Sequence, residues 1–443
     1  MRRTRFLVGA GAVVVLAAAF LFGGSSHKGH GFGSGASAAS ASTDEAVLSQ
    51  LLLGLAGNDT QAYVARLEQR LRTHGRRGDT LLLLGLAYQQ RARETGNPRF
   101  FTLSEEALRI AQRFSTVSSL ADGGLASLAV SRHRFRAALP LARAALRANP
   151  DDATALGALG DASLNIGRYR KAFVAYNKMA FLSPSVASYS RIAHARELLG
   201  RPRAAAEVLE LALTLRVPVR EHRAAAFVQL GNLQFNAGAL DDARRSYRAA
   251  LKAFPGYVHA QAGLAHVEAA AGDFGAALPL FRHIVTRLPL PQYAIWQGDA
   301  LLTAGDVAAA RRAYALVSVI ERIQAANGVR TELQSALFDV DHGRRLRDAL
   351  TRARQAYQRA PSIDAEDVLA WALLRNGQCG EALPHARRAL RFGTRDALKY
   401  FHRGMIERCA GHPAQGRRWL RRALTLNPHF SLLWAPVARR YAA

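Results

Sequence analysis

Polar residues that could bind a ligand recur in the chain at a regular interval. Asp161, His194, Asn232, His266 and Asp299 follow one another at spacings of 33, 38, 34 and 33 residues. These side chains can hydrogen-bond a ligand, and aspartate with histidine can also ligate zinc. Zinc ligands must converge to about 2 Å of the ion, whereas packed helices stand about 8–10 Å apart. Because the two histidines also lie two intervals apart, the sequence predicts no metal site.

Motifs of catalytic or nucleotide-binding sites are absent from the sequence. The chain contains no G-x-x-x-x-G-K-[ST], H-E-x-x-H or G-x-S-x-G, and the glycines of residues 25–43 do not form G-x-G-x-x-G. The regular units described next leave no segment long enough for an enzyme domain. The sequence therefore predicts a protein without enzymatic activity and without a cofactor.

The interval of the polar residues is also the interval of a helical hairpin. Residues 224–255 have the pattern of two amphipathic helices, joined by a turn at residues 236–239 and ended by Pro255. Gly238 in this turn has counterparts 33–38 residues apart, and Gly or Ala stands seven residues before each. Glycine inside a helix costs about 1 kcal/mol against alanine, so these small residues indicate close helix–helix contact. The turn glycines are Gly167, Gly200, Gly238, Gly272, Gly305, Gly343, Gly377 and Gly411.

This pattern resembles that of the tetratricopeptide repeat (TPR) family. In one unit the residues that carry the resemblance are Leu230, Gly231, Gly238, Ala243, Tyr247, Ala250 and Pro255. The resemblance covers about residues 80–428 and implies an all-α α-solenoid, a right-handed superhelix of about ten TPR-like helix-turn-helix repeats. Irregularities are expected where His133 replaces a turn glycine, where residues 91–99 lengthen a loop, and at inserts in residues 217–222 and 322–329.

The resemblance also implies a binding surface, because TPR arrays bind proteins and peptides in a concave groove lined by the first helix of each repeat. The five polar residues above stand six places before their turn glycines, and Leu337, Trp371 and Met405 continue the series. The series predicts a groove that hydrogen-bonds an extended peptide and then takes up an apolar side chain; the alternative is that these positions are only solvated. The predicted groove residues are Asp161, Asn165, His194, Asn232, Asn236, His266, Asp299, Trp371 and Met405.

Positive charge gathers towards the C-terminus. The chain has a formal net charge of +27, and from Arg344 onwards 19 arginines and one lysine stand against seven acidic residues. Arginines three and four residues apart on two second helices predict a basic convex face, which could contact anionic lipid or nucleic acid. The alternative is a solvated face. The predicted basic face comprises Arg387, Arg388, Arg391, Arg417, Arg418, Arg421 and Arg422.

The N-terminus has the pattern of a targeting element. Three arginines within the first five residues precede an uncharged run at residues 6–24, which is long enough to span a bilayer as a helix. Residues 1–24 are therefore predicted to be a signal peptide or an apolar transmembrane helix, with the rest of the chain outside the cytoplasm. The chain is expected to be membrane-anchored, or secreted if this segment is cleaved. The other segments are predicted to be a flexible Gly/Ser/Ala linker at 25–43, capping helices at 44–79, the repeats at 80–428 and a capping helix at 429–443.

The only two cysteines, Cys379 and Cys409, are predicted to form a disulfide. Cys379 follows Gly377 by two residues, where a second helix begins, and Cys409 precedes Gly411 by two residues, where the next first helix ends. Antiparallel packing would bring these helix ends within the Cα separation of roughly 4.4–6.8 Å that a disulfide needs. Export would supply the oxidising conditions. The alternative is two unrelated buried thiols.

Together these features predict a protein-interaction scaffold that binds a protein or peptide partner in the concave groove of a TPR solenoid outside the cytoplasm. The alternative is a regulator or adaptor whose basic convex C-terminal face binds nucleic acid or an anionic membrane surface. The location of the C-terminus separates the two, because a domain outside the cytoplasm would not meet nucleic acid.

Overall fold

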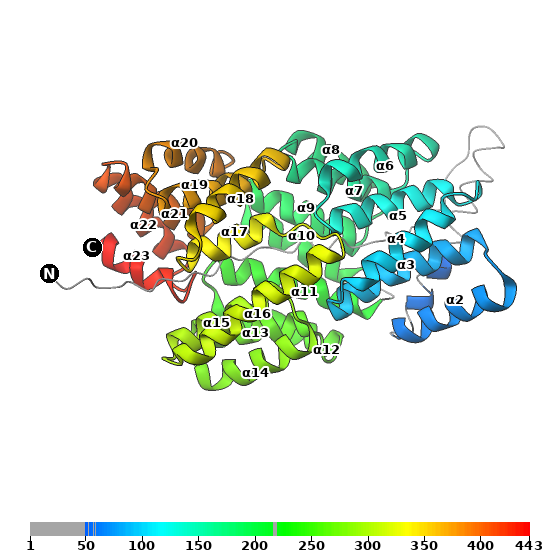
Figure 1. Cartoon of the computed structure of the whole chain (residues 1–443), viewed down its shortest axis with the longest axis horizontal. Coiled ribbons are helices and arrows are strands. Elements are labelled where there is room, and N and C mark those ends of the chain that lie inside the picture. The colour runs from blue at the N-terminus through cyan, green and yellow to red at the C-terminus, as the bar shows by residue number, and fades with distance from the viewer. Residues whose placement is uncertain (1–48, 52, 56, 58, 216–218) are drawn as a thin grey trace.

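The part of the chain that the structure describes is entirely α-helical. The computed structural model describes residues 49–51, 53–55, 57, 59–215 and 219–443, which contain helices α2–α23 and no strand (Figure 1). The predicted all-α class is confirmed. Helix α2 spans Thr60–His74 and α23 spans Trp434–Ala442. The helices between them are α3 Gly78–Thr95, α4 Arg99–Ala111, α5 Ser118–Ser131, α6 Phe135–Ala148, α7 Ala153–Asn165, α8 Tyr169–Leu182, α9 Val186–Leu198, α10 Pro202–Thr214, α11 Arg220–Asn236, α12 Leu240–Ala253, α13 Val258–Ala270, α14 Phe274–Arg287, α15 Pro291–Thr303, α16 Val307–Ala326, α17 Glu332–Asp341, α18 Leu346–Arg359, α19 Ile363–Arg375, α20 Cys379–Ala389, α21 Ala397–Cys409 and α22 Pro413–Leu426.

Helices α3–α22 form consecutive hairpins that stack as a solenoid, and the turn inside each hairpin explains the recurring glycine. Gly238 has a φ of 79°, in the left-handed region that a side chain disfavours, and all eight turn glycines have positive φ. His133 takes the same place in the hairpin of α5 and α6 and adopts a φ of 55°. The turn geometry is thus kept even where the sequence departs from glycine.

The small residue inside each first helix allows the second helix to approach closely. A Cβ atom placed on Gly160 would lie 2.3 Å from the ring of Tyr176, and one on Gly298 would lie 2.3 Å from the ring of Tyr314. No real Cβ contact is that short, so glycine is required for the tyrosine to pack there. Close helix contact, inferred above from the sequence, is confirmed.

The hairpins form two layers. The first helices of the hairpins (α3, α5 and so on to α21) make up an inner layer, and the second helices (α4 to α22) make up an outer layer. Ten of the 13 residues of α19 are buried, against three of the 11 residues of its partner α20. In Figure 1, α9, α11 and α17 lie near the middle of the molecule, whereas α6, α8 and α20 run along its upper margin. In this hairpin the inner helix is buried on most of its surface, and the outer helix on one face only.

Successive turns of the superhelix touch each other along a line that we call the seam. The hydroxyl of Tyr169 accepts a 2.7 Å hydrogen bond from the backbone N–H of Ile363, 194 residues further on. The side-chain amide of Asn427 donates to the carbonyl of Phe235 at 2.8 Å. Further seam contacts join Arg134 to the carbonyl of Gly328, and Thr394 to that of Leu198. Because turns of the array close on each other, little of the inner layer is left open to solvent.

Several predicted irregularities are corrected by the structure. Residues 91–95 do not belong to a longer loop, because α3 continues as a helix to Thr95. The insert predicted at residues 322–329 is largely helical and lengthens α16 to 20 residues. Near the other predicted insert, α11 begins at Arg220 and has 17 residues, while residues 216–218 are outside the described part. Extra residues in this solenoid thus extend helices rather than loops.

The two ends of the array differ in how much of them the structure describes. The predicted segments 1–24 and 25–43 lie outside the described residues. Leu51 and Leu55, near the start of the described part, pack with Tyr63 of α2 in the first core cluster. At the other end, α23 begins at Trp434, and the indole of this residue packs in the last core cluster. Among the helices described, none combines the length and the apolar character needed to cross a bilayer.

Candidate functional site

The predicted groove residues lie in the inner layer, and three of them accept hydrogen bonds within their own repeats. The hydroxyl of Tyr176 donates to Asp161 Oδ1 at 2.9 Å. In two other repeats the same contact recurs over the same 15-residue separation, with oxygen–oxygen distances of 2.7 Å. Those pairs are Tyr247 with Asn232 and Tyr314 with Asp299.

The two buried aspartates of this series also have cationic or imidazole partners. Asp161 is 5% exposed and receives both Nε and Nη2 of Arg191, at 2.9 and 2.7 Å. Asp299 is 2% exposed, and its Oδ1 lies 2.9 Å from Nε2 of His342. A two-point arginine–carboxylate pair of this kind satisfies most of the hydrogen-bonding capacity of both groups. These carboxylates therefore stabilise the contact between neighbouring repeats.

The aromatic members of the predicted groove are also packed inside the chain. Trp371 is 1% exposed; its indole N–H donates to Asp341 at 2.7 Å and its ring stacks on His402 at 4.4 Å between centroids. His266 stacks on the rings of Phe235 and Trp296, with centroids 4.3 and 4.1 Å away. Burial lowers the pKa of His266 to about 3, so its imidazole is neutral.

The remaining predicted groove residues are partly buried. Asn165 donates to the carbonyl of Asp161 in its own helix, and Asn236 donates to Glu197 at 3.3 Å. His194 lies 3.5 Å from the carboxylate of Glu197. Met405 packs against the last core cluster. Each of these side chains thus has a contact inside the chain.

Asp161, Asp299 and Trp371, which were predicted to line an open groove, are buried in the structure. The position six before the turn glycine does point inward, but contacts across the superhelix fill that space. Gln90 of α3 and Glu221 of α11, for instance, are both buried and lie within 3.4 Å of each other across a separation of 131 residues. At these positions the inner layer is a polar and aromatic core.

The predicted basic face divides into two parts. In α20, Arg388 Nε donates to Glu366 at 2.8 Å, and Arg391, just after the helix, lies over the ring of Tyr169 at 5.4 Å. These two arginines are held by intramolecular contacts, while Arg387 is exposed. In α22, Arg418 is exposed and Arg417 partly so. The other two arginines of α22, Arg421 and Arg422, line a hollow on the surface.

This hollow, which we call the C-terminal cleft, has a volume of about 510 Å³ and lies between the loop after α20, the start of α21 and α22. Its cationic lining consists of Arg395, Arg421 and Arg422, and its aromatic lining of Tyr400 and Trp419. No acidic residue of the described chain lines it. Arg395, Tyr400 and Trp419 were not predicted; the aromatic residue inside the run RRWLRR at residues 417–422 was the available signal.

Comparison with known proteins bears on the repeats. The family described as tetratricopeptide repeat matches residues 124–187, 191–258, 228–290 and 262–326. The matched residues, less than half of the chain, are similar to tetratricopeptide repeats. The TPR assignment made from the turn glycines is thus confirmed in the middle of the array, and the search of curated proteins found no match.

Several solved structures are similar to this TPR array. PilW, described as a widely conserved type IV pilus biogenesis factor, is 20% identical, with 50% of this chain and 98% of PilW covered at a TM-score of 0.38. Yeast Tom70 is 14% identical, and the match covers 82% of this chain and 87% of Tom70 at a TM-score of 0.39. The chain in a structure described as a human IFIT1 dimer with PPP-AAAA is 15% identical, and the match covers 75% of this chain and 78% of that chain at a TM-score of 0.45. Similarity at this level does not extend to partner or activity.

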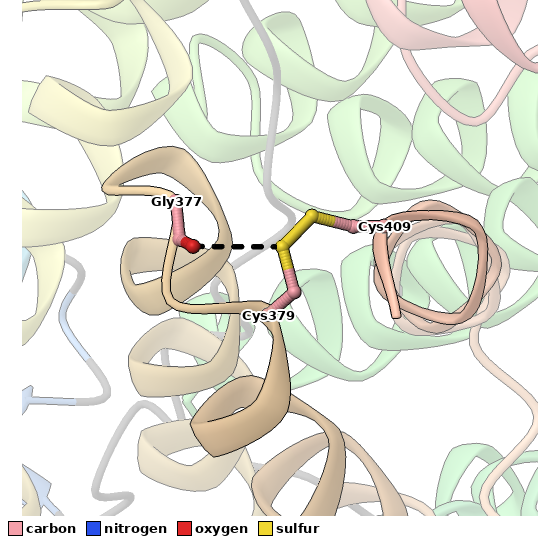
Figure 2. The surroundings of a disulfide bond; sticks show 3 residues. All are labelled: Gly377, Cys379 and Cys409. Carbon is pink, nitrogen blue, oxygen red and sulfur yellow. Dashed lines mark hydrogen bonds between the residues drawn. A yellow bond between two sulfur atoms is a disulfide. The ribbon is translucent and has the colours of Figure 1, made fainter. Parts of the chain in front are cut away.

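The two cysteines of the chain lie in the last two helical hairpins, α19–α20 and α21–α22. A disulfide joins Cys379, at the start of α20, to Cys409, at the end of α21, with a Cα–Cα distance of 5.7 Å (Figure 2). Cys379 Sγ lies 3.7 Å from the carbonyl oxygen of Gly377 in the turn before α20. The bond therefore ties together the two repeats that border the C-terminal cleft.

Among the described residues, no group of three or more His, Cys, Asp or Glu side chains is placed to hold a metal ion. Some histidines of the inner layer instead pair with a single carboxylate, as His402 does with Asp367 at 2.9 Å. Of the surfaces considered, the C-terminal cleft is the one that offers charged and aromatic side chains together, and it is the candidate site.

Proposed function

We propose that this protein is a protein-interaction scaffold whose partner binds the outer surface of the TPR array rather than a concave groove. The observation that carries the proposal is the closed inner layer. Many of its polar side chains have partners inside the chain, and the seam joins successive turns of the superhelix. A partner could reach those side chains only by replacing buried hydrogen bonds, each of which is costly to leave unmade.

The outer layer has the properties expected of an interaction surface. Its helices bury one face only, and it carries exposed apolar side chains such as Phe181 in α8, which is 84% exposed. It also carries the unpaired arginines of the C-terminal cleft. Because the repeats stack side by side along the array, their second helices together present an extended outer surface. Binding, and not catalysis, is the proposed activity.

Photo-cross-linking in native cells tests this proposal. A photoreactive amino acid would replace one residue at a time in the full chain, at outer positions Phe181, Ile323 and Arg418 or at inner positions Asn165 and Met405. We expect specific cross-links to a protein from the outer set only. Cross-links from the inner positions alone, or no protein cross-link from any outer position, would contradict the proposal.

We further propose that the array lies outside the cytoplasm, with residues 1–24 as anchor or signal. The uncharged run at residues 6–24 and its arginine flank support this location. The Cys379–Cys409 bond fits it as well, because disulfides persist in oxidising compartments. A reporter that is active only outside the cytoplasm, fused after Ala443, should be active, and activity of a cytoplasmic reporter instead would exclude this location.

A further inference from the structure

The arginines of the C-terminal cleft lack the acidic partners that two arginines of the neighbouring repeats have. Arg354 pairs with Glu381 at 3.0 Å, and Arg388 pairs with Glu366 at 2.8 Å. No ion pair among the described residues includes Arg395, Arg421 or Arg422. Positive charge without a counter-charge at the surface attracts an anionic partner.

The contacts that Arg421 and Arg422 make leave some of their donors available. Arg421 donates through Nε to the carbonyl of Ala442 at 2.9 Å, which fixes its position and leaves its terminal nitrogens without an acceptor among the described residues. The guanidinium of Arg422 lies 4.8 Å from the ring centre of Trp419. Guanidinium groups that are already oriented in this way lose less conformational entropy when they bind a carboxylate. The cleft is thus arranged for carboxylates.

The other half of the cleft is apolar. The rings of Trp419 and Tyr400 lie with centroids 5.3 Å apart, and the side chains of Leu390 and Leu426 complete the lining. A ligand with negative charge alone would leave this surface uncovered. A ligand that combines carboxylates with a large apolar side chain would use both halves.

Two observations favour a peptide over a nucleic acid strand. First, Trp419 already has the guanidinium groups of Arg422 and Arg403 over its ring, at 4.8 and 5.6 Å, so stacking of a base there would have to displace them. Second, the basic surface does not continue as a strand-length track, because Arg388 and Arg391 are held by Glu366 and by aromatic rings. The positive charge is local, which suits a short acidic segment.

We propose that the C-terminal cleft binds a short acidic peptide segment of a protein partner that also carries a large apolar side chain. Carboxylates pair with Arg395, Arg421 and Arg422, and the apolar side chain lies between Tyr400, Trp419 and Leu426. This inference rests on the proposed scaffold function and names where and how the partner is recognised. It assigns a role to the part of the predicted basic face that intramolecular contacts leave available.

Fluorescence anisotropy with labelled synthetic peptides tests the inference on the full chain. The probe is the peptide Asp-Glu-Phe-Asp-Glu; the control peptides are Asn-Gln-Phe-Asn-Gln and Asp-Glu-Ser-Asp-Glu. We expect the probe to bind more tightly than either control, because each control lacks one of the two features that the cleft recognises. Equal binding of the probe and either control peptide, or no binding of the probe, would overturn the inference.

Variants of matched charge locate the binding. Arg395→Ala and Arg422→Ala should each weaken binding of the probe by about tenfold, the usual effect of losing a hydrogen bond between charged groups. Arg418→Ala removes the same charge from an exposed position of α22 outside the cleft and should change affinity less than about twofold. Equal loss in all three variants would mean general charge attraction and would overturn the site.

Two further probes separate this inference from its alternatives and from the proposed function. A single-stranded oligonucleotide or phosphatidylserine vesicles that bind the chain with sensitivity to Arg422→Ala, and displace the probe, would overturn the peptide assignment. The scaffold proposal is judged separately, by the cross-links from outer positions such as Phe181 and Ile323. Cross-links from the outer positions would support the scaffold proposal even if the acidic peptide does not bind the cleft.

Discussion

Charged side chains occur both in the inner layer and in the C-terminal cleft, but they differ in ion pairing: Asp161 and Asp299 have ion-pair partners, whereas the arginines of the cleft have none among the described residues. Asp161 is buried against Arg191 and Tyr176. Arg395 and Arg422 line an open hollow in which the described chain places no carboxylate. The comparison teaches that a recurring polar residue in a repeat array can belong to the packing of the repeats, whereas unpaired charge at the surface is available to a partner.

Asp161→Ala should have the largest effect, and it tests whether ion pairs of the inner layer stabilise the fold. Removing one member of a buried ion pair leaves the other as an uncompensated buried charge, here Arg191, and costs about 3–5 kcal/mol of unfolding free energy. Denaturant unfolding followed by circular dichroism measures it. Asn165→Ala, one helical turn further along α7 and half-buried, is the control and should cost less than about 1 kcal/mol. A loss below about 1 kcal/mol for Asp161→Ala would show that the inner layer is not held in this way.

The disulfide stabilises the repeats that border the cleft. Replacement of Cys379 and Cys409 by serine opens a loop of 30 residues and should lower the unfolding free energy by roughly 2–4 kcal/mol in the chain-entropy model. Thermal unfolding under non-reducing conditions measures the effect. Reduction of the unaltered protein should produce the same shift, and an equal stability of reduced and oxidised protein would contradict the prediction.

Asp341 tests the inner layer through its pH dependence. Burial raises the pKa of this carboxyl from 3.8 to about 6, although His402, His342 and the hydrogen bond from Trp371 act in the opposite direction. Since its pKa is higher in the folded state than in the unfolded state, the ionised carboxylate opposes folding above pH 6. This opposition disappears as the pH falls towards 4, and it amounts to at most about 3 kcal/mol.

Asp341→Asn should therefore raise the unfolding free energy at pH 7.5, because the amide oxygen still accepts from Trp371 and carries no charge. The gain should shrink as the pH falls from 6 to 4, where the native carboxyl becomes protonated. Denaturant unfolding at several pH values measures both trends. A variant that is less stable than the native chain at pH 7.5, or a gain that grows on acidification, would contradict the assignment.

The smallest expected effects concern the cleft. Arg395→Ala and Arg418→Ala should each change the unfolding free energy by less than about 0.5 kcal/mol, because neither side chain makes an ion pair among the described residues. Measured beside Asp161→Ala, these variants sharpen the contrast between the two regions. A large loss of stability in Arg395→Ala would mean that this arginine belongs to the packing of the seam instead.

The repeats could be predicted from the sequence because one local rule recurs in them. The turns require a residue with positive φ, which favours glycine, and the packed tyrosines require glycine at Gly160 and Gly298. Both requirements recur in each repeat that has them and therefore appear as a period in the sequence. The contact between successive turns of the superhelix has no such periodic pattern in the sequence. It depends on small rotations between neighbouring repeats, which add up until Tyr169 meets Ile363, 194 residues later.

The structural role of the supposed groove residues did leave a signal. Aspartate or asparagine stands six residues before the turn glycine only in the repeats that have tyrosine nine residues after it: Asp161 with Tyr176, Asn232 with Tyr247 and Asp299 with Tyr314. This pairing in the sequence corresponds to the hydrogen bond in the structure. The cleft had a weaker signal, since Arg395 joins Trp419 and Arg422 only through the packing of α21 on α22.

The central claim is that the inner layer stays closed when the partner binds. Hydrogen–deuterium exchange of the full chain, alone and with its cross-linked partner isolated as a complex, tests this most directly. The account predicts slower exchange in α22 and in the loop at residues 390–396, with unchanged exchange in the inner helices α7 and α15. Altered exchange in α7 and α15, with none in α22, would show that the partner enters the superhelix and would contradict the account.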